Sequence, residues 1–237
     1  MKDPAAALAV SGLTSGYGEA IVIRRISLTV GAGEIVALLG KNGMGKSTLL
    51  KTVMGFLPAR EGNVVLDGTD VTRDAPHRIA RRAIAYTPQE QAIFQDLTVG
   101  DNLRLGQMEP GWFAEELARI CEAFPFLGER LDQRAGTLSG GEQKMLLIAR
   151  SLMARPRLML VDEISEGLQP SIVERLARVL VAERERTGVA MLLVEQNVRF
   201  ALEVADRWSV LKLGEIDDAG RSDVPNAASR IADHLSV

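Results

Sequence analysis

Gly40-Lys41-Asn42-Gly43-Met44-Gly45-Lys46-Ser47 matches the pattern G-x-x-x-x-G-K-[ST] at every fixed position. The apolar run that precedes it, residues 34–39, is typical of a buried parallel strand. The residues that follow, Ser47 to Met54, carry leucines at helical spacing and stop at Gly55. A strand that enters and a helix that leaves indicate a phosphate-binding loop. A glycine-rich turn without a ligand is the alternative, and both flanks argue against it.

The chemistry of this loop predicts a nucleoside triphosphate as its ligand. Its glycines let backbone N–H groups point at phosphates, and the following helix adds the positive end of its dipole. We expect Lys46 to contact the β- and γ-phosphates, and the Ser47 hydroxyl to contact Mg²⁺. Gly40 to Ser47, together with Thr48, therefore form the predicted nucleotide site.

Composition narrows the function classes. The 237 residues allow one large domain, or one domain with a subdomain. A net charge of −3 gives no basic face for nucleic acid. Cys121 is the single cysteine, which excludes an intramolecular disulfide. No apolar run approaches the roughly 18 to 20 residues of a membrane span, so at a membrane another chain must supply it.

Short strands and helices surround the loop. Alternating stretches at 8–10 and 26–30, with a further strand at 63–68, predict an antiparallel sheet beside the nucleotide core. Helical spacing at 97–102 and 112–123, interrupted by prolines, predicts a helical subdomain inserted between strands of the core. The expected fold class is therefore α/β.

A second motif, Leu138-Ser139-Gly140-Gly141-Glu142-Gln143, opens a predicted helix that ends near Ala154. Ser139 and Glu142 form an S-x-x-E capping box, so a well-capped helix is one reading. Yet two adjacent glycines in a first turn cost about 1 kcal/mol each against alanine. We expect bare backbone to be needed there, and an approaching phosphate is a natural reason.

Two carboxylates end the apolar run 158–161. Open α/β sheets place their chemistry at the carboxyl ends of strands, where Asp162 and Glu163 fall. We expect Asp162 to hold Mg²⁺ with Ser47, and Glu163 to orient or deprotonate the attacking water. Solvated acids at a strand end are the alternative; the phosphate loop upstream favours catalysis.

The phosphate loop, Gln89 after a strand, the LSGGEQ sextet and the Asp-Glu pair, in this order from Leu8 to about Gly214, resemble the ATP-binding subunits of ABC transporters. This resemblance implies a RecA-like P-loop core with a parallel sheet, an antiparallel β subdomain and an inserted α-helical signature subdomain. The expected organisation is a single ATP-binding domain over 1–237, with core and β subdomain at 1–93 and 156–214, helical subdomain at 94–155 and a tail at 215–237.

The resemblance also assigns residues. It makes Tyr17 the aromatic that stacks on adenine, although its place in a turn alone favours an ordinary tyrosine. It makes Gln89 a contact of Mg²⁺ and the γ-phosphate that links the site to the transmembrane partner. Ser139–Gly141 then complete the site of a second ATP-binding subunit in a head-to-tail dimer with two ATP molecules. Residues 165–170 lie at the dimer contact.

One position departs from the family. Gln196 stands where most ABC ATPases have a histidine that contacts the γ-phosphate, and His77 and His234 are far from this motif. Glutamine can donate a hydrogen bond to phosphate but cannot carry a positive charge. We therefore expect slower hydrolysis at this site, or a larger share of the chemistry in the paired subunit.

Val194-Glu195-Gln196-Asn197 and the Ser-x-Gly-Leu-x-Pro segment at 165–170 resemble the second ATPase of branched-chain amino acid importers, with urea and amide importers close by. This implies two permease chains, a different second ATPase, a solute-binding protein and a peripheral place on the cytoplasmic face of the inner membrane. The branch usually has Pro-Gln-Gly-Arg where this chain has Pro88-Gln89-Glu90-Gln91, at the expected permease contact.

Three other functions remain open. One is an exporter ATPase, and another is a regulatory subunit that binds ATP but scarcely hydrolyses it, which Gln196 suggests. The third is an ABC ATPase of translation or DNA repair. Members of that last group usually carry two cassettes or a long coiled-coil insertion, and this chain shows neither pattern.

Overall fold

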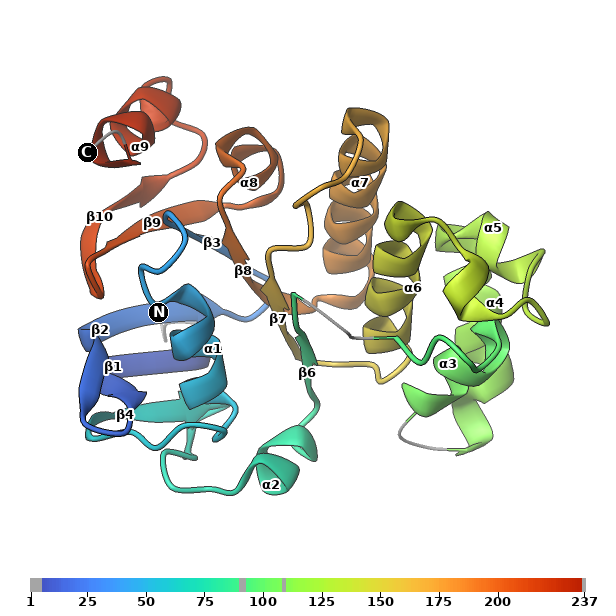
Figure 1. Ribbon diagram of the computed structural model, residues 1–237, viewed down its shortest axis with the longest axis horizontal. Helices are drawn as coiled ribbons and strands as arrows, with labels where there is room; N and C mark the ends of the chain where they lie inside the picture. Colours follow the sequence, from blue (N-terminus) through green and yellow to red (C-terminus); the bar gives the residue numbers. More distant parts are fainter. Residues whose placement is uncertain (1–5, 90–92, 108–109, 236–237) are drawn as a thin grey trace.

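The computed structural model describes residues 6–89, 93–107 and 110–235, which form two sheets and a set of helices (Figure 1). The smaller sheet is antiparallel, with strand order β2-β1-β4-β5. Its strands are β1 (Ala6–Tyr17), β2 (Ala20–Gly31), β4 (Glu61–Leu66) and β5 (Thr69–Asp70).

The larger sheet has the order β10-β9-β3-β8-β7-β6. Its strands are β3 (Ile35–Leu39), β6 (Ile84–Thr87), β7 (Leu158–Asp162), β8 (Ala190–Glu195), β9 (Arg207–Lys212) and β10 (Glu215–Arg221). All neighbours from β6 to β9 are parallel, and β10 pairs with β9 in the antiparallel sense. Every residue of β3, β7 and β8 is buried, as expected for uninterrupted apolar runs in a parallel sheet covered on both faces.

Helices cover this sheet and form a separate group beyond its β6 edge (Figure 1). We call α3 to α6 the helical region. The α-helices are α1 (Lys46–Val53), α2 (Pro76–Ala80), α3 (Val99–Leu105), α4 (Phe113–Ala123), α5 (Pro125–Gly128), α6 (Gly140–Leu152), α7 (Pro170–Thr187), α8 (Val198–Val204) and α9 (Ala227–Leu235). Short 3₁₀ turns lie at Pro110–Trp112 and Ala135–Thr137.

Alternating residues of the large sheet enter two different hydrophobic cores. In β3, Ile35, Ala37 and Leu39 face the core shared with α6, α7 and α8, whereas Val36 and Leu38 face the core shared with β1, β2 and α1. This follows from the two-residue period of a strand. The carboxyl ends of the parallel strands are thereby held between two packed layers.

Residues 215–237, expected to form a tail without a recognisable motif, contain β10 and α9. The strand extends the large sheet beyond β9, and α9 buries Ala227 and Ile231 against the core. Arg230 lies over the Trp208 ring, 5.0 Å from its centroid, and binds Asp218 through two nitrogens. These contacts depend on residues distant in sequence, which local patterns do not reveal.

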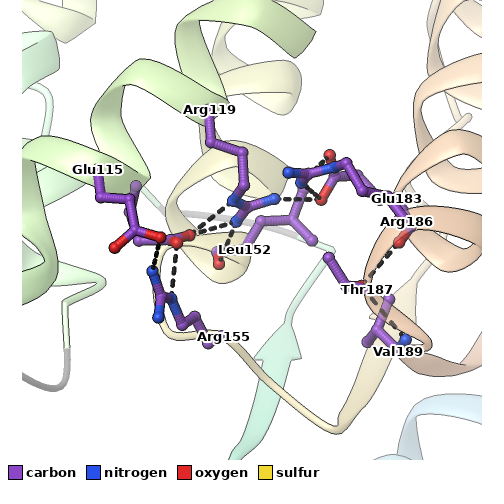
Figure 2. A network of polar contacts seen from close by, with 9 residues as sticks. Glu115, Arg119, Leu152, Arg155, Glu183, Arg186, Thr187 and Val189 are labelled. Atoms are coloured by element: carbon purple, nitrogen blue, oxygen red, sulfur yellow. Dashed lines mark hydrogen bonds and ion pairs between the residues drawn. The ribbon is translucent and has the colours of Figure 1, made fainter.

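A network of ion pairs joins the helical region to α7 (Figure 2). Arg119 of α4 contacts Glu116 (Nη2 to Oε2, 2.6 Å), Glu183 of α7 and the carbonyl oxygen of Leu152 (2.9 Å). Arg155 adds a bond from its Nε to Glu116 Oε1 (2.6 Å). The carboxylates of Glu116 and Glu183 are 4% exposed, so the guanidinium of Arg119 compensates two buried charges.

Arg119→Met should lower the free energy of unfolding by about 3–5 kcal/mol, because it leaves two buried carboxylates with fewer cationic partners. Urea unfolding followed by circular dichroism measures the change. Arg178→Met, which removes the same charge from an exposed position of α7, is the matched control and should change stability by less than about 0.5 kcal/mol. If Arg119→Met lowers the free energy of unfolding by less than about 1 kcal/mol, the ion-pair network does not stabilise the contact between the helical region and α7.

Candidate functional site

The phosphate-loop residues connect β3 to α1 at the carboxyl edge of the large sheet (Figure 1). Gly45 has φ +103°, and a Cβ there would lie 2.7 Å from Ile23 Cγ2. A Cβ on Gly40 would lie 2.7 Å from the carbonyl oxygen of Leu211. Both positions therefore require glycine, the first for its backbone conformation and both for space.

Lys46 is folded back over this loop. Its Nζ donates to the carbonyl oxygens of Gly40 (2.7 Å) and Lys41 (2.9 Å), and it lies 2.9 Å from Glu163 Oε1. The side chains of Lys46 and Glu163 are each 3% exposed. The loop thus presents a buried, fully partnered ammonium group at its centre.

The Glu163 carboxylate accepts hydrogen bonds from side chains that the sequence predicts to contact the γ-phosphate. Gln89 Nε2 donates to Glu163 Oε2 at 3.0 Å, and Gln196 Nε2 donates to the same oxygen at 2.8 Å. Gln196 also donates to Asn42 Oδ1 at 2.7 Å. One carboxylate therefore engages Lys46, Gln89 and Gln196 together, so an arriving anion must compete with it for these three donors.

Asp162 lies beside this cluster at the end of β7 and is 2% exposed. Burial raises the pKa of its carboxyl; the charge of Glu163 acts in the same direction, while a hydrogen bond from Ser47 and the charge of Lys46 oppose it. Its Oδ1 is buried without a hydrogen-bond partner among the described residues. A carboxylate oxygen left free beside a hydroxyl is the donor set of a hard cation.

Within the described ranges, no group of three or more His, Cys, Asp or Glu side chains could hold a metal ion. A cation at Asp162 would need oxygen ligands from Ser47, from an amide, from water or from a bound ligand. That composition suits Mg²⁺, which keeps several waters and binds through few carboxylates.

An open cavity of about 290 Å³ covers the loop, lined among others by Asn42, Gly43, Ser47, Thr48 and Gln89. A larger cavity of about 600 Å³ lies at the Arg119 network. We assign the nucleotide to the smaller cavity because a glycine loop, a helix N-terminus and an ammonium group converge there. The charges at the larger cavity already pair with one another.

Other predicted residues lie apart from this cluster. Tyr17 ends β1 and is 47% exposed. Lys41 and Met44 line a different cavity beside Leu213 and are not among the residues that line the loop cavity. Glu90 and Gln91 lie outside the described residues.

Ser139–Gly141 begin α6 and do not line the loop cavity. The predicted capping box is present, with Ser139 N donating to Glu142 Oε2 at 2.9 Å and Glu142 N donating to Ser139 Oγ at 3.4 Å. A Cβ at Gly140 would meet nothing within 4 Å. This end of α6 is therefore open to an approaching group.

Three polar residues near the site were given no individual role from the sequence, although Glu166 lies in the segment expected at the dimer contact. Glu195 is 2% exposed and accepts hydrogen bonds from Ser165 N (3.0 Å) and Oγ (2.7 Å). Glu166 Oε2 accepts from Gln89 Nε2 at 2.7 Å, and Lys144 donates to backbone carbonyls of the same segment. Glu195 lies in the motif at 194–197 and Glu166 in the segment at 165–170, so these motifs could have identified both residues. Lys144 belongs to none of the motifs described above.

Comparison with known proteins gives the family. The family model described as "ABC transporter" matches residues 23–166, which include the loop, the sextet and the acidic pair. The chain belongs to the ABC transporter family. As an ABC transporter ATP-binding subunit it binds and hydrolyses ATP, and subunits of this family work as dimers with transmembrane permease components.

Relatives of this ABC subunit differ in the transport they serve. It is 40% identical to the high-affinity branched-chain amino acid transport ATP-binding protein BraG of Pseudomonas aeruginosa, over 95% of this chain and 98% of that one. It is 37% identical to the lipopolysaccharide export system ATP-binding protein LptB of Escherichia coli, over 89% of each chain.

The fold of the ABC subunit is that of a solved relative. A nucleotide-free ATP-binding cassette from an ABC transporter has a TM-score of 0.86 at 26% identity, covering 98% of this chain and 97% of that one. The expected α/β class, with its parallel core and antiparallel sheet, is confirmed. None of the helices in the described part of the chain has both the length and the hydropathy of a membrane span.

Proposed function

We propose that this subunit energises the uptake of branched-chain amino acids, or of a related small polar solute such as urea or an amide. The observation that carries the proposal is the 40% identity to BraG across 95% of this chain and 98% of that one. The residues at 194–197 and 165–170, which resemble the second ATPase of branched-chain amino acid importers, agree with this proposal. Its place would be the cytoplasmic face of the inner membrane, held there by permease chains.

The loop residues would bind the triphosphate, with Lys46 on the β- and γ-phosphates and Tyr17 stacked on adenine. Ser47 and Asp162 would hold Mg²⁺, with Gln89 nearby, and the unpartnered Oδ1 of Asp162 supports this fit. The ion would supply charge neutralisation at the phosphates.

Glu163 would act as the general base or the water-orienting group. Its carboxylate contacts Lys46, Gln89 and Gln196. Phosphate oxygens compete for those donors, so nucleotide entry would release the carboxylate to accept a hydrogen bond from water. Lys46, Gln89 and Gln196 would then bind the phosphates, and Glu163 would bind the attacking water.

Ser139–Gly141 would complete the site of a second ATP-binding subunit in a head-to-tail dimer. These residues do not line the loop cavity of the same chain, and this and the open space at Gly140 support the arrangement. The further partners would be two permease chains and, indirectly, a solute-binding protein. No nucleic acid is expected as a partner.

Transport measurements test the proposed solute. Uptake of radiolabelled leucine and of urea should be compared in cells with the wild-type gene, a deletion, and a Glu163→Gln allele. Loss of one uptake activity in both altered strains supports the proposal. Unchanged uptake together with an outer-membrane permeability defect would support the exporter alternative, which the similarity to LptB favours.

A regulatory subunit with little hydrolysis is the second candidate, because Gln196 cannot carry a charge. Gln196→His should raise phosphate release from the assembled complex by only about fivefold, since the glutamine already donates to Glu163 and a charged donor adds roughly 1 kcal/mol. Phosphate release in the complex measures this. An increase of about a hundredfold would instead identify the wild-type site as weakly hydrolysing.

A further inference from the structure

Lys144 connects α6 to the segment that carries the proposed catalytic acid. Its Nζ donates to the carbonyl oxygen of Glu166 at 2.5 Å and to that of Glu163 at 3.4 Å. We propose that Lys144 is a positioning residue that ties the helix of Ser139–Gly141 to residues 163–166 and thereby sets the position of Glu163. The inference rests on the proposed role of Glu163 in hydrolysis.

Residues 163–166 form a turn that requires outside support. Glu163 has φ +48°, a left-handed conformation that costs a non-glycine residue roughly 1–2 kcal/mol. Its carbonyl oxygen accepts one bond from Glu166 N, at 3.3 Å. Lys144 brings a cation to this carbonyl and to the one at the far end of the turn, so it stabilises the conformation that points the Glu163 side chain at Lys46.

Three side chains hold this turn, and they come from different parts of the molecule. Glu195 at the end of β8 binds Ser165, and Gln89 after β6 binds Glu166. Both of these anchors lie at or just beyond the carboxyl ends of strands of the large sheet. Lys144 comes from the helical region, so its bonds link the turn to a part of the molecule outside that sheet.

The ammonium group lies among charges that favour its cationic form. Burial is the larger effect and lowers the pKa of Lys144 below its ordinary value, while the carboxylates of Glu166, Glu195 and Glu163 act in the opposite direction and offset part of it. A charged donor to carbonyl oxygens forms a stronger bond than a neutral one. The link is therefore suited to transmit a displacement of α6 to the turn.

The same helix begins one turn earlier with Gly140, where a Cβ would meet nothing, and Gly141, where a Cβ would contact Ile172 and Leu168. Gly141 and Lys144 are three residues apart, which is about 4.5 Å along a helix axis. Any shift of the N-terminus of α6, such as one caused by a phosphate bound there, would move Lys144 with it. The alternative is that Lys144 only covers two carbonyl oxygens at the surface and has no effect on turnover.

Lys144→Met keeps a long apolar stem and removes the donors. In the assembled complex we expect kcat for ATP to fall about tenfold, which corresponds to ~1.4 kcal/mol, with KM changed less than twofold. Lys144→Arg should restore at least about half of the activity, because it retains a cationic donor. Arg178→Met, which removes a charge from the exposed face of α7, should leave kcat unchanged.

Hydrogen exchange supplies a measurement that does not depend on turnover. In Lys144→Met the amides of residues 163–168 should exchange at least about threefold faster, while those of α7 keep the wild-type rate. If this variant does not fold, Lys144→Gln replaces it in both experiments. Wild-type kcat, or unchanged exchange at 163–168, would overturn the inference.

The outcome is separable from that of the proposed function. If Glu163→Gln lowers turnover strongly and Lys144→Met does not, only the positioning role fails. If Glu163→Gln itself leaves turnover unchanged, the proposed catalytic role fails whatever the Lys144 variants do.

Discussion

Glu163→Gln should lower ATP turnover by about 10²- to 10⁴-fold, the usual effect of losing a general base, while nucleotide binding persists. The amide has nearly the shape of the carboxylate but accepts a proton poorly. Phosphate release from the assembled complex, compared with ATP binding to the same preparation, measures both properties. Glu174→Gln, at an exposed site of α7 where the carboxylate pairs with exposed Arg199, is a matched control that should not alter turnover.

The contact between Glu163 and Lys46 adds a second expectation for Glu163→Gln. The wild-type carboxylate lies 2.9 Å from Lys46 Nζ, so we expect it to compete with phosphate for this ammonium group. Removing this charge should raise ATP affinity severalfold, because a neutral amide holds the ammonium less strongly. Near-normal turnover in the variant would remove Glu163 from the catalytic role, and weaker ATP binding would contradict the competition.

Lys46→Ala should reduce ATP affinity by about 10²-fold or more, because the phosphates lose their central cation. It should also lower the free energy of unfolding by about 3 kcal/mol, since Glu163 is 3% exposed and would lose its cationic partner. Calorimetric titration with Mg²⁺ and ATP measures the first effect, and urea unfolding measures the second.

The double variant Lys46→Ala/Glu163→Gln separates these two effects. It should recover most of the lost stability, because no buried charge is left unpaired, yet it should still bind ATP weakly. Wild-type affinity in Lys46→Ala would refute the assignment of the loop. A double variant no more stable than Lys46→Ala would show that the Lys46–Glu163 pair does not govern the stability of the nucleotide-free chain.

Much of the fold could be predicted because its signals are local. The apolar runs that became β3, β7 and β8 are uninterrupted, and the helix at Gly140–Leu152 begins at the predicted cap. The antiparallel sheet was anticipated, but β1 and β2 are much longer than the alternating stretches at 8–10 and 26–30. Register shifts in their pairing break the two-residue alternation, so the pattern reveals only part of each strand.

The residues of the site could be named, but their arrangement could not. Lys46, Gln89 and Gln196 each belong to a sequence motif that lies just beyond a predicted strand. These motifs explain why the sequence could assign the three residues to the site. That all three bind Glu163 follows from side-chain geometry, for which motif spacing has no signal. The same is true of Lys144, whose acceptors are backbone carbonyls, and of Arg119, whose partner Glu183 lies in another helix.

We expect the loop at 40–47 to bind the triphosphate through Lys46. Calorimetric titration of the purified chain with ATP in the presence of Mg²⁺, for wild type and Lys46→Ala side by side, tests it most directly. We expect saturable binding of about one nucleotide per chain in the wild type and its loss in the variant. Absence of saturable binding in the wild type, or equal binding in both proteins, would contradict the account.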